Sequence, residues 1–406
     1  NHPPPISSDE AWRRLSDPSR NYAPWTHQEL IVAAEVGSRP LGVHAAFTSK
    51  ATGNWSTEGQ TTWTEVGHPV AGDTVSIGAH TITVDVASAC ASITFSAAGT
   101  LACGANAVTM TSTFTLNATG TLTASTGGIT GCTSFTCNNV VTCTGAALFS
   151  VAGNVTISGT FTYSTSVIKT TAAGTFNSSV TIYKWEHNVA GATQTLGANL
   201  TAAYSVRVTA GTVDTSAANN WSMTTTNFQI IVLGVLDCRG SVISAGSEIS
   251  STTEWMMRVN YGGTLTGGSG THTYGSFYVE NNGNATMSSG STTLNGYTTA
   301  EKYTMGWGSS ATFSHGGGTV IFVYAGTQLF DSASNVARTL NNVQLNNAAL
   351  VLQYRDGTGF NLTVAGTFTA TLGQFISADI TSGTSRNLTV TGTSSITGTC
   401  TPGATS

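Results

Sequence analysis

The sequence predicts an all-β chain: a right-handed parallel β-helix preceded by a short, partly helical N-terminal arm. Three observations lead to this prediction. Only 8% of the 406 residues are charged while glycine occurs 46 times, which does not fit the Glu- and Lys-rich composition of long helices. Apolar and polar residues alternate in short segments, and a short motif recurs along the chain.

The alternation begins at about residue 53 and continues to the end of the chain. Ser92–Phe95, Thr113–Leu116 and Thr121–Ala124 are examples, and glycine or asparagine separates such segments. Period-two alternation over four residues gives a strand with one buried face, and β-branched residues favour it. No stretch after residue 53 shows a convincing helical period.

The repeat is Gly-Thr followed by an apolar residue. It begins at Gly99, Gly120, Gly159, Gly174, Gly211, Gly263, Gly318 and Gly366. A longer form starts at Asn154, Asn361 and Asn387, and the interval between its last two copies falls within the range of solenoid repeats. A unit this short, with two or three strands and no helix, is typical of one turn of a parallel β-helix. A β-sandwich array or propeller is the alternative, although the Asn-Gly hairpin turns of such folds occur only twice here.

The first 50 residues differ from the rest, because they hold 10 of the 33 charged residues and six of the eight prolines. Residues 8–15 and 25–36 read as two short helices. The arm is either a cap packed on the body or a module that attaches the chain to a larger assembly. We expect further segments at 51–96 (opening cap), 97–251 (coils), 252–310 (an irregular aromatic-rich section) and 311–406 (C-terminal coils).

Composition also excludes several functions. Fourteen scattered cations cannot form a basic face, so no nucleic-acid partner is expected. No apolar run is long enough to span a bilayer, so no membrane insertion is expected. The seven cysteines form no Cys-x-x-Cys pair, and we expect no metal and no cofactor. The thiols are interpreted as small buried residues in strands, with disulfides left open.

Residues 53–95 carry a resemblance to a known family. The stretch contains Gly53-Asn-Trp-Ser56, Thr62-Trp63, Pro69-Val-Ala-Gly-Asp-Thr-Val-Ser-Ile77 and Thr81-Ile-Thr-Val-Asp85. This pattern resembles the opening of many secreted and viral β-helix proteins, including G8-type domains. The resemblance implies the first strands of a right-handed parallel β-helix.

The same residues have structural roles in this opening. Trp55 and Trp63 are large enough to plug the open end of a solenoid. Gly72 and Asp73 suit a tight turn, and Asp73 is interpreted as a turn former rather than a catalytic acid.

Three later tracts carry a second likeness: Phe313–Phe322, Leu340–Asn347 and Asn361–Val364. They resemble repeats in large bacterial surface proteins and phage fibre proteins. The resemblance implies extracellular exposure, adhesion or a place in a virion appendage, and homotrimers are common among such fibres.

Acidic residues are sparse and no catalytic residue is assigned. A glycosidase needs two carboxylates facing one another. Two series of acids recur at intervals close to one coil, so a carboxylate ladder on one face is conceivable: Asp214, Asp237 and Glu254, and Asp331, Asp356 and Asp379. Surface acids at turns are the favoured interpretation. The cluster Lys184-Trp-Glu-His187 is either a sugar site or, as we favour, a corner loop.

Aromatic residues concentrate between 252 and 307. Because exposed aromatic rings stack on sugars, we take five of them as candidate residues for a glycan or receptor: Trp255, Tyr261, Tyr278, Tyr303 and Trp307. An inter-subunit seam or an enlarged core is an equally weighted alternative.

The leading functional hypothesis is an extracellular structural and adhesive fibre, a phage tail fibre or spike that contacts host surface glycans. It would be a homo-oligomer, expected to be a trimer, that joins other virion or surface proteins through residues 1–50. The alternatives are a polysaccharide-degrading tailspike or secreted lyase or hydrolase, and a cellular surface adhesin or sheath subunit.

Overall fold

A computed structural model describes residues 44–57, 60–117, 119–246, 255–298, 302–332, 336–354, 361–379 and 386–401. Within these ranges every regular element is a strand, and the strands form a parallel β-solenoid of about 13 turns. The predicted all-β parallel solenoid is therefore confirmed. The two predicted helices of the arm lie outside the described residues.

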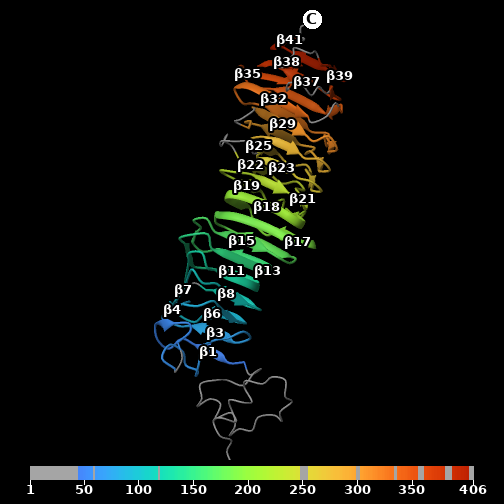
Figure 1. The fold of residues 1–406 in the computed structure, drawn as a ribbon. Helices are drawn as coiled ribbons and strands as arrows, with labels where there is room; N and C mark the ends of the chain where they lie inside the picture. Colours follow the sequence, from blue (N-terminus) through green and yellow to red (C-terminus); the bar gives the residue numbers. More distant parts are fainter. Residues whose placement is uncertain are drawn as a thin grey trace, which may run out of the picture. The chain divides into compact units, whose positions relative to one another are not determined.

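The chain forms two compact units (Figure 1), and the finer segment limits expected above stay a prediction. The first unit comprises residues up to 152 together with 156–166, and the second comprises 153–155 and 167 onward. Strand β13 (Leu148–Ile157) contributes residues to both units.

Each turn of the first unit contributes to three parallel ladders. The first ladder contains β1 (Ala46–Thr48), β3 (Thr74–Ile77), β6 (Ser92–Phe95), β9 (Thr113–Leu116) and the end of β11 (Ile129–Cys137). The second contains β2 (Gly53–Asn54), β4 (Thr81–Thr83), β7 (Thr100–Gly104), β10 (Thr121–Ala124), β12 (Val140–Cys143) and β14 (Phe161–Thr162). The third contains β5 (Ser88–Cys90), β8 (Val108–Met110) and the start of β11.

The second unit repeats this plan. Its first ladder contains β15 (Val167–Thr170), β17 (Ile182–Leu196), β18 (Leu200–Asp214), β20 (Ile230–Val232), β23 (Met257–Val259), β26 (Phe277–Val279), β29 (Tyr303–Trp307), β32 (Gly326–Ser332), β35 (Leu350–Tyr354), β38 (Gln374–Asp379) and β41 (Thr399–Thr401).

Its second ladder contains β16 (Gly174–Ser178), the ends of β17 and β18, β21 (Val235–Asp237), β24 (Thr264–Thr266), β27 (Asn284–Thr286) and β30 (Thr312–Ser314). A separate three-stranded sheet follows, made of β33 (Arg338–Leu340), β36 (Leu362–Val364) and β39 (Leu388–Val390).

Its third ladder starts from the beginning of β18. It continues through β19 (Met223–Thr225), β22 (Ile243–Ala245), β25 (His272–Tyr274), β28 (Ser291–Leu294), β31 (Thr319–Phe322), β34 (Asn342–Leu345), β37 (Phe368–Ala370) and β40 (Ser394–Ile396).

The core of each unit is a set of apolar columns, because register partners on successive turns point inward together. In the first unit one column contains Phe47, Val75, Ile93, Phe114 and Phe135. In the second unit one column contains Trp185, Val206, Ile230, Met257, Phe277, Met305 and Phe330. Truncating one such aromatic residue to alanine removes contacts with two turns and typically costs about 3–5 kcal/mol.

The last two copies of the longer motif occupy equivalent places on successive turns. Leu362 pairs with Leu388 and Val364 with Val390, so the copies of the motif that start at Asn361 and Asn387 lie one turn apart. Glycine is required at the corner before β7, because a Cβ on Gly99 would lie 1.9 Å from the carbonyl oxygen of Gly78 on the preceding turn.

Asparagine side chains join successive turns at other corners. Asn139 Nδ2 donates to the carbonyl of Gly120 at 2.6 Å, and Asn347 Nδ2 donates to that of Val323 at 2.7 Å. Each of these hydrogen bonds joins uncharged groups on neighbouring turns. They satisfy backbone carbonyl groups that have no strand partner at a corner. They explain why asparagine is frequent in a chain with so few charges.

Two tryptophans, Trp55 and Trp63, fill the core at the first described turn of the first unit. Trp63 packs edge-on against Trp55 at 5.5 Å and against Phe47 at 6.0 Å, and all three are fully buried. Residue 63 also forms an antiparallel bridge with Ser49, beside β1. The two tryptophans therefore fill the core at the first described turn, and the antiparallel segment pairs with backbone there.

Asp73 closes a turn in this opening. Its carboxylate is fully buried and accepts hydrogen bonds from the amides of Ala45 and Val70, both at 2.8 Å. Gly72 has a φ of +92°, which favours glycine. The geometry agrees with the interpretation of Asp73 as a turn former.

Six cysteines are buried free thiols, and the first five of them lie in strands: Cys90, Cys103, Cys132, Cys137, Cys143 and Cys238. Burial raises the pKa of the Cys103 thiol to about 12 and that of Cys143 to about 11. They act as small apolar residues, as the sequence predicted.

Candidate functional site

The aromatic-rich section places side chains on both faces of the first ladder of the second unit. Met257, Phe277 and Met305 point inward and are buried in the core. One position later in each strand, Arg258, Tyr278 and Gly306 are register partners on the outer face. The outer face carries the candidate residues.

An apolar cluster lies outside the solenoid core on this face. It consists of Trp255, Tyr303 and Leu329, with Tyr278 packed against it, and we call it the outer aromatic cluster. The Trp255 ring stacks on Tyr278 at 4.7 Å and 18°, and on Tyr303 at 5.9 Å and 10°. These near-parallel stacks leave Trp255 only 7% exposed.

Gly306 provides the space for this cluster. A Cβ at Gly306 would lie 2.9 Å from Tyr278 Cδ2, 3.0 Å from Trp255 Cη2 and 3.0 Å from Asp331 Cβ. Any larger residue in this outward position would displace at least one of these groups. The glycine is therefore a packing requirement of the cluster.

A polar rim, made of Arg258, Glu280 and Tyr261, borders the cluster. The Arg258 guanidinium forms an ion pair with the Glu280 carboxylate, which also accepts a hydrogen bond from the backbone amide of Tyr261 at 3.3 Å. Tyr261 is 68% exposed. The rim thus combines an exposed aromatic ring with a planar charged pair, groups that contact sugar rings and hydroxyls.

The structure brings together three of the five predicted ligand residues, Trp255, Tyr278 and Tyr303, and places Tyr261 in the adjoining rim. Trp307 differs: it is fully buried in the core, 6.1 Å from Phe330. Its inward register partner Val279 explains this, because alternation sends residue 307 inside. Trp307 has no exposed surface for a ligand, and Trp255 has very little.

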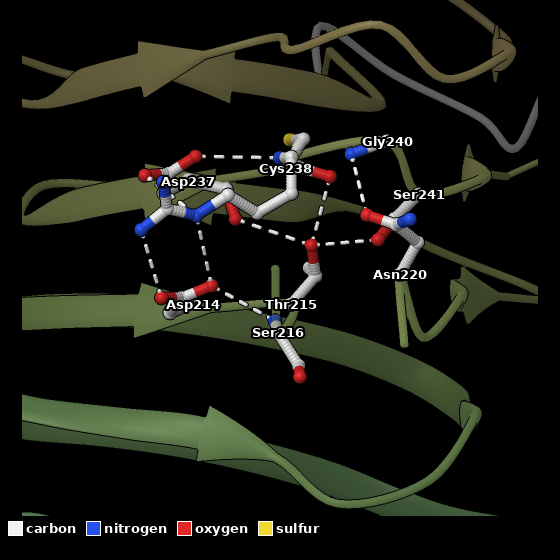
Figure 2. Close-up of polar contacts among 9 residues, drawn as sticks. Asp214, Thr215, Ser216, Asn220, Asp237, Cys238, Gly240 and Ser241 are labelled. Atoms are coloured by element: carbon white, nitrogen blue, oxygen red, sulfur yellow. Dashed lines mark hydrogen bonds and ion pairs between the residues drawn. The ribbon is translucent and has the colours of Figure 1, made fainter. Parts of the chain in front are cut away.

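A second polar group, shown in Figure 2, lies at a corner of the same unit. Asp214 ends β18 and Asp237 ends β21, and the two are register partners on adjacent turns. Their spacing in the sequence, close to one turn, had indicated this alignment. Glu254, the third residue of the expected ladder, lies outside the described residues.

Arg239 joins the two carboxylates. Its Nε and Nη2 donate to Asp214 at 3.2 and 3.0 Å, and its Nε lies 3.2 Å from Asp237 Oδ2. The hydrogen bond to Asp214 raises the pKa of the Arg239 guanidinium above its ordinary value. Arg239 and the two carboxylates together carry a net charge of −1, whereas the carboxylates alone would carry −2.

Buried hydroxyls support this corner from the inside (Figure 2). Ser241 Oγ donates to Thr215 Oγ1 at 2.7 Å, and Thr215 Oγ1 donates to the carbonyl of Cys238 at 2.8 Å. On the surface, the amide of Gly240 donates to Asn220 Oδ1 at 2.9 Å. The network fixes the backbone on which Arg239 is carried.

The other expected carboxylate ladder does not align in the same way. Tyr354 pairs with Phe330 on one side and with Asp379 on the other, whereas Asp331 pairs with Gly306. Asp331 and Asp379 therefore occupy neighbouring columns rather than one. Asp356 lies outside the described residues.

The cluster at 184–187 divides between two faces. Trp185 and His187 are fully buried in the core, and burial lowers the pKa of His187 below its ordinary value. Lys184 and Glu186 alternate with them on the outer face, where Glu186 lies 3.8 Å from Lys169 Nζ. The indole is thus not part of a surface sugar site.

Sequence reasoning missed an aromatic stack on successive turns. Tyr183 stacks on Tyr204 at 5.0 Å, and Tyr204 stacks on Phe228 at 4.7 Å, with interplanar angles of 14° and 15°. The three rings lie two residues before Trp185, Val206 and Ile230, which are inward-pointing register partners on successive turns. Their intervals in the sequence, each close to one turn, were the available signal.

Comparisons with known proteins add no assignment: no family model matches the chain, and neither a curated protein nor a solved structure gives a significant match. Among the described residues, no group of three or more His, Cys, Asp or Glu could hold a metal ion. No helix in the described ranges is long and apolar enough to cross a membrane.

Proposed function

We propose that this chain is an extracellular structural and adhesive fibre subunit that contacts glycans on a host surface. The observation that carries the proposal is the outer aromatic cluster with its polar rim. A solenoid needs only its inward columns to be stable, whereas this section builds a further apolar layer outside them and presents an exposed Tyr261 beside an Arg–Glu pair.

In this proposal the glycan contacts the rim rather than the rings of the covered stack. Tyr261 supplies an accessible aromatic face, and the Arg258–Glu280 pair supplies donors and acceptors for hydroxyl groups. Tyr278, which is only partly buried, forms the boundary between the rim and the cluster. Trp255 and Tyr303 act as support that holds the rim in place.

Binding of the full chain to host cells or to an array of surface glycans tests this proposal. Tyr261→Ala should reduce binding strongly, because it removes the exposed ring without altering the core. Leu372→Ala is the matched control, since Leu372 is also an exposed large residue of the second unit, at 46%. Equal binding by Tyr261→Ala and the unsubstituted chain would refute the assignment of the rim.

The proposal further places the chain in a virion appendage, as a phage tail fibre or spike. In this view it forms a homotrimer and joins other virion proteins through residues 1–50. Antibody labelling in electron micrographs distinguishes this role from that of a cellular adhesin or sheath subunit. Label on cell envelopes but not on virus particles would reject it.

A polysaccharide-degrading enzyme is the second candidate, and the register pair Asp214 and Asp237 favours it. Adjacent turns lie about 4.8 Å apart, close to the separation of about 5 Å between the carboxylates of retaining glycosidases. The ion pairs with Arg239 count against it, because both carboxylates are already engaged. Release of new reducing ends or unsaturated uronates, lost in Asp214→Asn, would establish the activity.

A further inference from the structure

The first unit carries a regular patch of hydroxyl groups on the outer face of its first ladder. Four successive strands, β3, β6, β9 and the end of β11, each place two hydroxyl side chains outward. We call these eight residues the hydroxyl array: Thr74, Ser76, Ser92, Thr94, Thr113, Thr115, Ser134 and Thr136.

The array is two-dimensional because the strands are in register. Ser76 pairs with Thr94, Thr94 with Thr115, and Thr115 with Thr136, so one column crosses four turns. The parallel column begins at Thr74 and runs two residues earlier in each strand. Hydroxyls therefore repeat about every 4.8 Å between turns and about every 6.6 Å along each strand.

The hydroxyl groups of the array remain available to a ligand. The Thr94 hydroxyl donates one long bond, 3.5 Å to the carbonyl of Val75, and the other seven side chains have no hydrogen bond to the described protein. Beneath the array, Phe114 and Phe135 stack at 5.1 Å and only 9°.

The solenoid itself does not impose this uniformity. In the second unit the outer face of the first ladder carries Lys169, Glu186, Arg207, Ile231 and Arg258 at register positions. The fold tolerates charged, branched and aromatic groups on this face. The restriction of the array to serine and threonine is thus a property of the first unit's sequence.

We propose that the hydroxyl array is a surface that binds ice. The oxygen atoms of hexagonal ice repeat along two perpendicular directions with distances similar to those of the array. A rigid set of hydroxyls can therefore order water in a compatible lattice, and the threonine methyl groups limit competing arrangements of surface water. This inference goes beyond the proposed fibre function and does not depend on it.

The chemistry of the array favours this occupant over a glycan or a protein. It offers no guanidinium or ammonium group for an acidic sugar and no aromatic ring for a pyranose face. It also lacks the large apolar anchors that dominate protein interfaces. At these spacings the described array measures only about 14 Å by about 7 Å. We therefore expect it to bind ice more weakly than a more extended array would.

Partition of the full chain into slowly growing ice tests the proposal. The unsubstituted chain should be enriched in the ice fraction, whereas an unrelated soluble protein is excluded from it. Thr115→Lys, at the centre of the array, should reduce the enrichment to the level of the excluded protein. Ile231→Lys is the matched control, because it adds the same group at an outward position of the second unit and should leave ice binding unchanged.

Thr94→Lys provides a second variant if Thr115→Lys does not fold, because Thr94 lies in the same column and is exposed. Circular dichroism checks that each variant is folded. Exclusion of the unsubstituted chain from ice overturns the proposal, and so does uptake of a folded array variant at the unsubstituted level. Binding to crystalline cellulose or chitin without uptake into ice also overturns it. Because the test uses no host surface, its result does not depend on the proposed fibre function.

Discussion

Removing Arg239 should destabilise the second unit by bringing two carboxylates into direct repulsion. Arg239→Ala deletes the group that lies within 3.2 Å of both Asp214 and Asp237. Two unit charges about 5 Å apart repel by about 0.8 kcal/mol at the dielectric constant of water and by about 3 kcal/mol at an effective value of 20. The side chains of Asp214 and Asp237 are only 18% and 21% exposed, so the repulsion between them lies between these two energies.

The attraction lost with the guanidinium is small, because Arg239 is 42% exposed and surface ion pairs contribute about 0–1 kcal/mol. The free energy of unfolding should therefore fall by about 1–3 kcal/mol in total. Arg239 has a φ of +50°, and alanine carries a comparable backbone cost there, so the substitution isolates the charge.

Chemical denaturation at low and high salt measures this effect. The deficit of Arg239→Ala should shrink at about 1 M salt, where the Debye length is about 3 Å. The double variant Arg239→Ala with Asp214→Asn should recover most of the loss even at low salt. A deficit that is unchanged by salt and by Asp214→Asn would refute the electrostatic reasoning and point to lost packing.

Three further predictions concern other parts of the chain. Gly306→Val should cost about 1–3 kcal/mol by overpacking and should remove the near-ultraviolet circular dichroism of the Trp255 stack; an unaltered spectrum would contradict the role of the glycine. Asp73→Ala should cost about 3 kcal/mol or more, because two amide donors lose a charged acceptor, and a variant with an unchanged denaturation midpoint would count against it. Burial lowers the pKa of His272 to about 4, so the unfolded chain binds the proton first, and stability should fall as the pH drops below about 6.5, by up to about 3 kcal/mol. His272→Gln should flatten that pH dependence in denaturation curves, and an unchanged pH dependence in this variant would contradict the reasoning.

The solenoid was predictable because its energetics are local and repetitive. Alternation defines which residues point inward, and a recurring Gly-Thr motif marks corners or strand starts on several of the turns. Both signals lie within about one turn of sequence, so no long-range information is needed. The pairing of Asp214 with Asp237 followed from the same logic, since their separation in the sequence is close to one turn.

The candidate site was predictable only in part. The density of aromatic residues indicated the section, but not which rings lie outside the core. Trp307 is buried and Tyr261 exposed because one lies at an inward strand position and the other in a turn. The stack of Tyr183, Tyr204 and Phe228 was missed because alternation does not decide side-chain direction there: the pairing of β17 with β18 is irregular next to Tyr183, and Phe228 precedes β20.

The sequence by itself determined that strands form, that they repeat, and that the chain has too few charges for a basic or acidic binding face. Only the tertiary structure decided register, and register decided which side chains meet. A shift of one residue would move Gly306 away from Tyr278 and would separate Asp214 from Asp237. The reason is physical: periodicity is set by the backbone, whereas contacts between turns depend on how loops of different lengths return the chain to the same position.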